Sequence, residues 1–303
     1  MRIDLHTHSN VSDGTESPAE VIRSAKAAGL DVVALTDHDS TGGWDAAAAQ
    51  AADSGIEFVP GIEVSCSHRG ISIHLLSYWH SDADAEVAAM VAKTREARVH
   101  RAREIVDLIA VDYPVTWEQV LDRSGEATTV GRPHIADALV AHGVVPTRDA
   151  AFEKILAGNS RYYVPHYAPE VTAAVRTMRA AGGVPVFAHP GADARGRVVP
   201  ASVIEAMSQA GMVGLEVDHR DHSPEQRVRL SLIADRLALV RTGASDYHGT
   251  GKLNRLGENL TTEDALTVLR AARRGDCGGR VLPEAVAPGS CSHGSTGSPF
   301  RSG

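Results

Sequence analysis

Two histidines separated by one residue stand near the start of the chain, in the run Met-Arg-Ile-Asp-Leu-His-Thr-His. Residues 3–5 are predicted to form a short strand. Because side chains alternate along a strand, His6 and His8 should point to the same side. Two neutral imidazoles on one face supply half of a transition-metal site. Asp13 follows five residues later in a polar loop. This opening therefore predicts a metal site.

Further residues of ligand type follow or lie within apolar runs along the chain. They are His38, Glu63, His74, His189, Asp246 and His248. Asp37 and Asp39 flank His38, and we expect these carboxylates to orient its ring. Each residue alone also fits a plain interpretation, such as a surface histidine or a turn residue. Nine such residues at recurring strand ends favour one shared metal centre.

The elements that must position these residues alternate between strands and helices. Apolar runs predict strands at residues 3–5, 32–35, 56–59, 71–75, 184–188, 213–217 and 237–242. Helical patterns lie between most of them; one opens with the capping box of Ser17 and Glu20 and closes at Gly29. This alternation predicts βαβ units and a parallel sheet. Ligand residues at many strand ends favour a barrel with its active site at that face.

Composition agrees with a single large enzyme domain. The chain has 303 residues, 43% of them hydrophobic, and no apolar run approaches the ~20 residues of a membrane span. Its three cysteines are widely spaced, so neither a disulfide framework nor a zinc knuckle is predicted. We expect a soluble cytoplasmic enzyme with no membrane partner. The net charge of −8 argues against binding duplex nucleic acid, so any nucleic-acid substrate should be short.

Two segments stand apart from the barrel pattern. A long helical pattern from about residue 83 to 110 carries several basic residues, and shorter helices are predicted near 133–141 and 147–157. We interpret residues 99–165 as a helical insertion that covers the substrate, within a barrel domain of residues 1–284. Residues 285–303 are rich in Gly, Ser and Pro and are predicted to be a disordered tail. Cys291 and His293 in this tail are given no role.

The set of motifs resembles the polymerase and histidinol phosphatase (PHP) family over about residues 1–282. The motifs are His-Thr-His-Ser at 6–9, Thr-Asp-His-Asp at 36–39, Gly-Ile-Glu at 61–63, the histidine of 71–75, Ala-His-Pro-Gly at 188–191 and Ser-Asp-Tyr-His-Gly at 245–249. The resemblance implies a distorted (β/α)7 barrel, two or three metal ions and phosphoesterase chemistry. Gly-Arg-Pro-His at 131–134 and Tyr-Val-Pro at 163–165 resemble one branch, which acts on nucleoside 3′,5′-bisphosphates and on short oligoribonucleotides from the 5′ end.

The resemblance also implies a ligand set for each of three metal positions. The first would be held by His6, His8, Glu63 and Asp246. The second would share Glu63 and add His74 and His189. The third would be held by Asp13, His38 and His248. Glu63, Asp246 and His248 would also belong to the catalytic residues.

Such a site suits the hydrolysis of phosphate esters. Three divalent ions and three carboxylates would leave a formal charge of about +3, which fits a phosphate dianion and a hydroxide. Metal coordination lowers the pKa of water from ~16 towards ~7, so we expect a metal-bridging hydroxide as nucleophile and no covalent enzyme intermediate. A His and carboxylate set without Cys suits Mn²⁺, the expected ion, with Fe²⁺ or Zn²⁺ as alternatives.

Residues of the insertion are candidates for substrate binding. The planar guanidinium of Arg132 is suited to bind a second phosphate through two parallel hydrogen bonds. Arg98 and Arg101 share a helix face. The alternative for these arginines is a solvated basic surface. His134 either contacts substrate or packs beside Pro133. His219 and His222 follow a predicted strand, and one of them is a candidate proton donor to the leaving group.

Three functions remain open at this point. The leading one is removal of the 3′-phosphate from nucleoside 3′,5′-bisphosphates such as 3′-phosphoadenosine 5′-phosphate, together with 5′→3′ cleavage of short RNA. The second is a histidinol-phosphate phosphatase, against which the helical insertion argues. The third is a non-catalytic metal-binding PHP module, against which the complete set of nine ligand residues argues.

Overall fold

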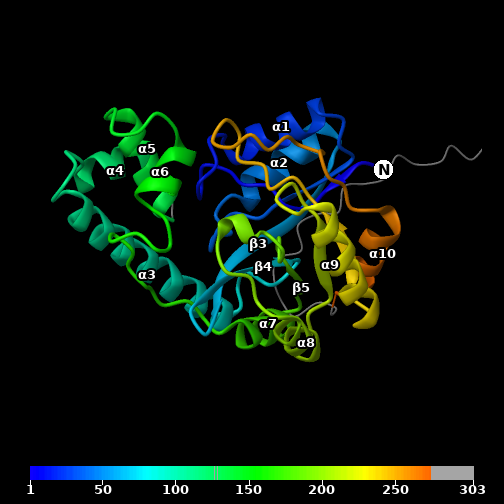
Figure 1. The fold of residues 1–303 in the computed structure, drawn as a ribbon. Coiled ribbons are helices and arrows are strands. Elements are labelled where there is room, and N and C mark those ends of the chain that lie inside the picture. Colours follow the sequence, from blue (N-terminus) through cyan, green and yellow to red (C-terminus); the bar gives the residue numbers. More distant parts are fainter. Residues whose placement is uncertain (126, 128, 274–303) are drawn as a thin grey trace, which may run out of the picture.

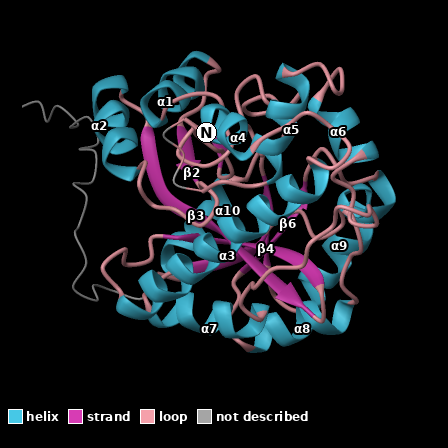
Figure 2. Ribbon diagram, turned by 90° about the vertical axis from the view of Figure 1, so that its left-hand side faces the viewer, coloured by secondary structure: helices cyan, strands magenta, loops and turns pink. Residues whose placement is uncertain are grey.

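The computed structural model describes residues 1–125, 127 and 129–273. Its seven strands form one sheet in chain order, which helices surround (Figures 1 and 2). The strands are β1 (Ile3–Asp4), β2 (Val32–Leu35), β3 (Glu57–His68), β4 (Ile71–Tyr78), β5 (Val184–Phe187), β6 (Gly214–Asp218) and β7 (Val240–Gly243). After β1, the His8 amide donates to the Tyr247 carbonyl beyond β7 at 2.8 Å. This contact brings the two ends of the sheet together, so the predicted distorted (β/α)7 barrel is confirmed.

The sheet is mixed, and the prediction of a parallel sheet is wrong at β4. This strand pairs antiparallel with both β3 and β5, whereas the other neighbours are parallel. The physical reason is the connection: β3 runs on to His68, and only Arg69 and Gly70 separate it from β4. Both have positive φ, +47° and +75°, as a tight hairpin turn requires. A two-residue link is far too short for the crossover that a parallel pair needs.

Helices α1 (Pro18–Ala27), α2 (Trp44–Ser54), α7 (Val171–Ala180), α8 (Ala201–Gln209), α9 (Pro224–Arg236) and α10 (Glu263–Ala271) lie around the barrel. The predicted capping box opens α1: the Ser17 hydroxyl accepts from the Glu20 amide, and the Glu20 carboxylate accepts from the Ser17 amide. Apolar faces of these helices pack on the strands, as Met178 of α7 and Met207 of α8 do beside Leu215 of β6. This packing fixes the strand ends that carry the ligand-type residues.

The remaining helices lie within the predicted insertion and at its edge. They are α3 (Ala85–Ile109), α4 (Trp117–Ser124), α5 (Arg132–Ala141) and α6 (Arg148–Lys154). The first half of α3 packs on the barrel through Val87 and Val91. Its second half joins an apolar cluster with α4, α5 and α6, which lies to one side of the barrel (Figure 1). Helix α3 therefore contacts both the barrel and the small cluster beside it.

Two further expectations concern the chain as a whole. Within the part of the chain that the structure describes, no helix is both long enough and apolar enough to cross a bilayer. The predicted tail at 285–303, with Cys291 and His293, lies outside the described residues, as do residues 274–284 of the predicted barrel domain.

Candidate active site

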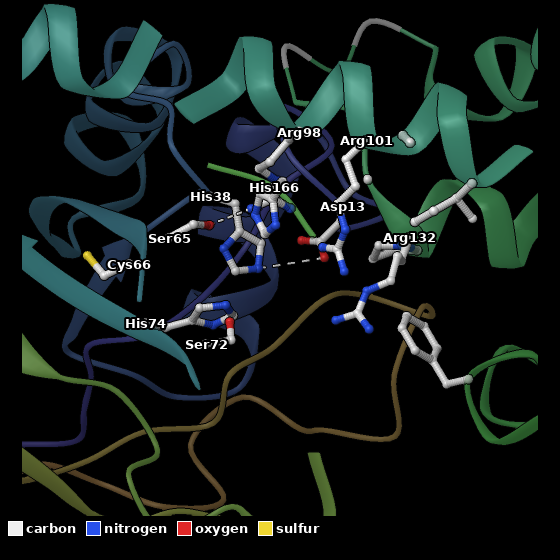
Figure 3. A pocket seen from close by; sticks show the side chains of 15 residues that line it. Asp13, His38, Ser65, Cys66, Ser72, His74, Arg98, Arg101, Arg132 and His166 are labelled. Carbon is white, nitrogen blue, oxygen red and sulfur yellow. Dashed lines mark hydrogen bonds and ion pairs between the residues drawn. The ribbon is translucent and has the colours of Figure 1, made fainter. Parts of the chain in front are cut away.

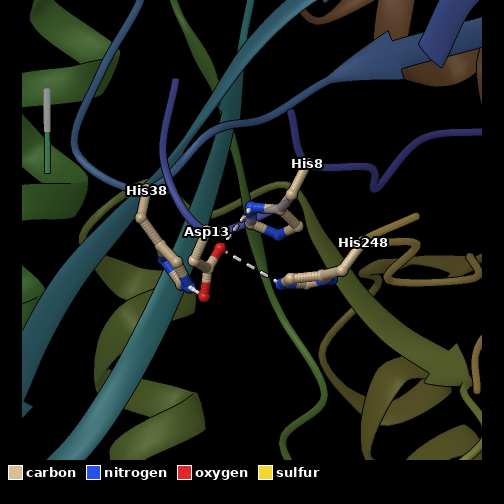
Figure 4. A group of neighbouring side chains, drawn as sticks. All are labelled: His8, Asp13, His38 and His248. Carbon is tan, nitrogen blue, oxygen red and sulfur yellow. Dashed lines mark ion pairs between the residues drawn. The ribbon is translucent and has the colours of Figure 1, made fainter. Parts of the chain in front are cut away.

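All nine ligand-type residues gather at one face of the barrel. His6, His8 and Asp13 follow β1; His38 follows β2; Glu63 and His74 lie within β3 and β4; His189 follows β5; and Asp246 and His248 follow β7. Three groups have ligand atoms within 4.8 Å of one another: His6, His8, Glu63 and Asp246; His8, Asp13, His38 and His248 (Figure 4); and His38, Glu63 and His74. Seven of the nine residues are buried, and His74 and His189 are partly exposed. The side chains that the sequence grouped are therefore neighbours in space.

Glu63 lies at the centre of this arrangement. One carboxylate oxygen, Oε2, faces three imidazoles, at 3.1 Å from His8, 3.2 Å from His38 and 3.3 Å from His6. The other oxygen, Oε1, faces the remaining two, at 2.9 Å from His74 and 3.1 Å from His189. A carboxylate whose two oxygens face different sets of imidazoles would be able to bridge two ions if each set held one.

The donor atoms of this cluster fit metal ions. Buried polar atoms normally have hydrogen-bond partners. Within the described residues, His38 Nδ1, Glu63 Oε2, His74 Nδ1 and His248 Nε2 are buried without one. Imidazole nitrogens and carboxylate oxygens suit Mn²⁺, Fe²⁺ and Zn²⁺. The residues present can therefore hold divalent ions, while their assignment to individual ions stays a prediction.

The protonation states agree with ligand binding at most positions. Burial would raise the pKa of Glu63, but the neighbouring His38 and His74 outweigh it and hold this pKa well below its usual range. Burial, helped by Arg195, lowers the pKa of His189 to about 3. His8 differs: burial opposes its charge, yet the neighbouring carboxylates of Asp246 and Glu63 raise its pKa to about 9. An ion that binds His8 must therefore displace a proton.

Glu216 of β6 is a site residue that the sequence analysis missed. Its Oε1 lies 3.1 Å from His6 Nδ1, and its Oε2 accepts from the His189 amide at 2.7 Å. Burial would raise the pKa of this carboxyl, but His6 lowers it to about 2. Glu216 thus orients two ligand-type residues, as an outer carboxylate does in metal sites. An acidic residue inside the apolar run 213–217 was the signal that could have identified it.

The expected role of Asp37 and Asp39 is wrong. Asp37 accepts hydrogen bonds from the Ser9 amide and from the hydroxyls of Ser9 and Ser12. Asp39 accepts from the amide and hydroxyl of Ser65 and from a guanidinium of α3. Both carboxylates fix the loops around His38, and neither contacts its ring, because buried serine donors satisfy their oxygens first.

A basic pocket opens beside the ligand cluster (Figure 3). Asp13, His38 and His74 line both the pocket and the cluster. The opposite wall carries Arg98 and Arg101 of α3, Arg132 of α5, Phe152 of α6 and His166. An anion in the pocket would therefore lie next to the candidate metal ligands.

The three arginines of the pocket differ in their partners. Arg98 pairs with Asp39 at 3.0 Å and so supports the loop. Arg101 donates to the Val164 carbonyl at 2.8 Å, and Arg132 to the Leu156 carbonyl at 3.1 Å. Neither has a carboxylate partner among the described residues. Burial and the charge of Arg132 lower the pKa of Arg101 to about 10. Two partly buried guanidiniums without carboxylate partners among the described residues are able to bind an anion.

His166 is a second residue that the sequence analysis missed. It belongs to the irregular segment between α6 and α7 and reaches the pocket wall. Burial and the neighbouring Arg101 lower its pKa to about 3, so the ring is neutral at pH 7 and its protonation does not add to the arginine charge. A single histidine among Tyr163, Tyr167 and prolines gave no periodic signal.

The other histidines of the candidate set have internal partners. His134 Nδ1 accepts from the Gly131 amide at 3.1 Å and caps α5, and His134 does not line the pocket. Its role in substrate binding stays a prediction. His222 contacts the Gly191 amide and the Val217 carbonyl through its two ring nitrogens. This leaves no free nitrogen on His222 for a leaving group. His219 is buried, and its Nε2 has no partner within the described residues.

Comparison with known proteins is consistent with this geometry. The model of the PHP domain matches residues 4–119. The chain is 36% identical to a 3′,5′-nucleoside bisphosphate phosphatase of Chromobacterium violaceum, over 82% of this chain and 88% of that protein. It is 31% identical to a 5′-3′ exoribonuclease of Haemophilus influenzae, over 88% and 96%. It is also 31% identical to a phosphoribosyl 1,2-cyclic phosphate 1,2-diphosphodiesterase of Eggerthella lenta, over 81% and 94%.

A solved structure shares the whole fold. The crystal structure described as a putative metal-dependent phosphoesterase from Bifidobacterium adolescentis superposes with a TM-score of 0.88 and 40% identity, over 92% of this chain and 98% of that one. The described residues thus match a relative across nearly its full length. Together with the motifs, the barrel and the ligand cluster, these similarities show that the chain belongs to the PHP family of phosphoesterases.

Proposed function

We propose that this protein is a metal-dependent phosphoesterase that removes the 3′-phosphate from nucleoside 3′,5′-bisphosphates. We propose further that the same site cleaves short oligoribonucleotides from their 5′ end and that the enzyme acts in the cytoplasm. Two relatives are named for these two activities, and both are matched over most of their length. The two reactions break the same bond, between phosphorus and a 3′-oxygen, so one site can serve both.

The observation that carries the proposal is the position of the pocket. Arg101 and Arg132 are partly buried cations without carboxylate partners among the described residues, and they line the same pocket as Asp13 and His38 of the cluster. A substrate with two phosphates can place its 5′-phosphate on the arginines and its 3′-phosphate at the cluster. Binding at two points fixes the reacting phosphate against the ligand residues. A monophosphate would lack one of these anchors.

The nine ligand residues would hold divalent ions, Mn²⁺ by preference. Ions bound there would supply positive charge to the phosphoryl oxygens and a nucleophile at neutral pH. The protein itself contributes orientation: Glu216 holds the ring of His6 and the backbone amide of His189, and the Asp37 and Asp39 carboxylates hold the loops. Burial of the cluster keeps bulk water away from these contacts.

The alternative functions fit the pocket less well. Histidinol phosphate carries an ammonium group and a single phosphate, and two unpaired guanidiniums would repel the ammonium. A non-catalytic metal-binding module would need the ligand residues but not the basic pocket beside them. The relative from Eggerthella lenta is named for a cyclic phosphodiester. Phosphoribosyl 1,2-cyclic phosphate is therefore a useful comparison substrate.

The test is product analysis with Mn²⁺-loaded protein. We expect 3′-phosphoadenosine 5′-phosphate to be converted to AMP and inorganic phosphate, far faster than L-histidinol phosphate or phosphoribosyl 1,2-cyclic phosphate. Nuclear magnetic resonance of phosphorus distinguishes AMP from the 3′-monophosphate. Faster turnover of either comparison compound would contradict the proposal.

A further inference from the structure

Three nitrogen donors converge on one oxygen of Asp246, at an edge of the ligand cluster that does not line the basic pocket. Asp246 Oδ2 lies 2.7 Å from Arg195 Nη2, 3.1 Å from Lys252 Nζ and 3.7 Å from His219 Nε2. The other oxygen, Oδ1, lies 3.4 Å from His6 and 3.4 Å from His8. One oxygen thus faces the candidate metal ligands, and the other faces only donors.

His219 indicates that this group of donors lacks an acceptor. Its side chain is fully buried. Its Nδ1 accepts a hydrogen bond from the Asp221 amide at 3.0 Å, so the neutral ring carries its proton on Nε2. That Nε2 has no hydrogen-bond partner within the described residues. A buried N–H without an acceptor is costly, and it is expected where a ligand supplies the acceptor.

The two cations beside His219 are open to solvent. The Arg195 side chain is 32% exposed, and that of Lys252 is 33% exposed. Arg195 also pairs with Asp221 at 2.6 Å, so a carboxylate still balances it if Asp246 binds an ion. Lys252 has no second carboxylate in the described part of the chain. The Lys252 ammonium has three donor hydrogens and this single carboxylate contact, so it can also donate to a ligand when Oδ1 of Asp246 binds an ion.

The basic pocket and the donors at Asp246 lie at different edges of the ligand cluster. Together they define the direction in which an oligonucleotide would cross the site. In the proposed reaction, water adds to the scissile phosphorus, the bond from phosphorus to the 3′-oxygen breaks, and that oxygen leaves with the first nucleotide and takes a proton. The phosphate stays on the second nucleotide. If the 5′-phosphate of the first nucleotide occupies the Arg101 and Arg132 pocket, the remaining chain extends from the cluster by another edge. The Asp246 edge supplies donors for its phosphates.

We infer that Lys252, Arg195 and His219 form a binding site for the phosphates of the downstream strand, which sets the preference for oligonucleotides over bisphosphates. The inference rests on the proposed function, because it takes the 5′-phosphate to lie in the arginine pocket. Lys252 is the residue to change, because it is partly exposed and its replacement should not disturb folding. Loss of one charge-assisted contact to a phosphate should weaken binding about tenfold.

The test compares Lys252→Gln with wild-type protein on two substrates, the 5′-phosphorylated trinucleotide pApApA and 3′-phosphoadenosine 5′-phosphate. We expect the ratio of kcat/KM for trinucleotide to that for bisphosphate to fall about tenfold. Lys26→Gln, which loses only a contact to the Gly55 carbonyl, is the matched control and should leave the ratio unchanged. A ratio that stays constant while both rates fall would show that Lys252 only supports Asp246, and would overturn the inference.

A binding measurement separates this inference from the proposed function. Metal-free protein is titrated with fluorescently labelled pApApA, and we expect Lys252→Gln to raise the Kd for the trinucleotide about tenfold more than the Kd for the bisphosphate. An equal change in both values would contradict the inference. Wild-type protein that binds both compounds but hydrolyses neither after loading with Mn²⁺ would refute the proposed function alone, because the Kd values still decide the role of Lys252.

Discussion

At the scale of single residues, the candidate centre depends most on Glu63. Its two oxygens face five imidazoles, and the histidines around it hold its pKa well below the usual range. A glutamine at this position would keep the size of the side chain but replace one acceptor oxygen with a donor. An amide cannot bridge two ions in the way that a carboxylate can. The identity of this one atom should therefore decide metal content.

We predict that Glu63→Gln lowers the number of bound ions by at least one per chain and lowers kcat by more than about 100-fold. Changes in outer partners of metal ligands already cost 10–100-fold, and a central ligand should cost more. Elemental analysis after dialysis gives the ion content, and phosphate release gives kcat. Glu57→Gln, at the start of the same strand, removes only a partly exposed pair with Arg270 and should behave as wild type. Full ion content in Glu63→Gln would refute the bridging assignment.

At the scale of elements, strand positions were more predictable than strand directions. β2 has the predicted bounds, and β1, β5 and β6 differ by about one residue at either end, because short β-branched runs bounded by polar turns carry a local signal. β3 extends to His68, well beyond the predicted end. Glu63 and His74 therefore lie inside antiparallel strands rather than at the ends of parallel ones. The prediction found the ligand residues but not the hairpin that positions two of them.

The basic pocket could be predicted only in part. Arg101 and Arg132 were identified as candidates because guanidiniums suit phosphate. That neither pairs with a carboxylate of the described residues depends on long-range contacts, such as that between Arg132 and the Leu156 carbonyl. His166 became a site residue only through packing between distant segments. No local pattern encodes such contacts, since they depend on how α3, α5 and α6 lie against the barrel.

The cluster formed by α4, α5 and α6 is held to the barrel by a contact that should matter for substrate binding. Arg148 of α6 pairs with Asp137 of α5, and its Nη1 donates to the Gly251 carbonyl at 3.4 Å, next to Lys252. We predict that Arg148→Ala raises the KM for 3′-phosphoadenosine 5′-phosphate about fivefold with a smaller change in kcat, because lost hydrogen bonds of about 1 kcal/mol loosen the pocket wall. Initial-rate kinetics measure both constants.

Arg161→Ala is the matched control for this prediction. Arg161 also belongs to the inserted region and pairs with Asp112, but its side chain is 67% exposed. Exposed pairs contribute little, so its KM should stay within about twofold of wild type. Equal effects of the two substitutions would show that the docking contact at Gly251 has no special role.

At the scale of the whole molecule, an acidic protein must attract an anionic substrate. The net charge is −8, yet arginines concentrate at the pocket and a further pair of cations lies at Asp246. Local positive charge in a partly enclosed site acts over the ~8–10 Å screening length, whereas the acidic surface disfavours long polyanions. The overall charge pattern therefore fits nucleotides and short strands better than duplexes.

The stability of the whole fold should fall in mild acid, and His80 contributes to this. Burial lowers the pKa of His80 to about 4, whereas an unfolded histidine has its pKa near ~6.5. The unfolded chain therefore binds the proton first, so this contribution to stability is present above pH ~6.5 and is lost as the pH falls towards 4. Between pH 7 and pH 5 the loss should be about 2 kcal/mol.

Urea unfolding of metal-free protein at both pH values tests this expectation. His80→Gln, which cannot take up the proton, should lose about 2 kcal/mol less than wild type between pH 7 and pH 5. The other buried histidines contribute equally to both proteins, so the difference isolates His80. Identical pH dependence in the two proteins would mean that His80 does not carry this effect.

The most direct test of the central claim, that two phosphates bind at two separate points, compares 3′-phosphoadenosine 5′-phosphate with 3′-AMP in wild type and Arg132→Ala. The two substrates share the reacting phosphate and differ only in the 5′-phosphate. We predict that Arg132→Ala lowers kcat/KM for the bisphosphate by about 10–100-fold and leaves 3′-AMP nearly unchanged, with Arg132→Lys between the two. An equal loss on both substrates, or none on either, would contradict the account.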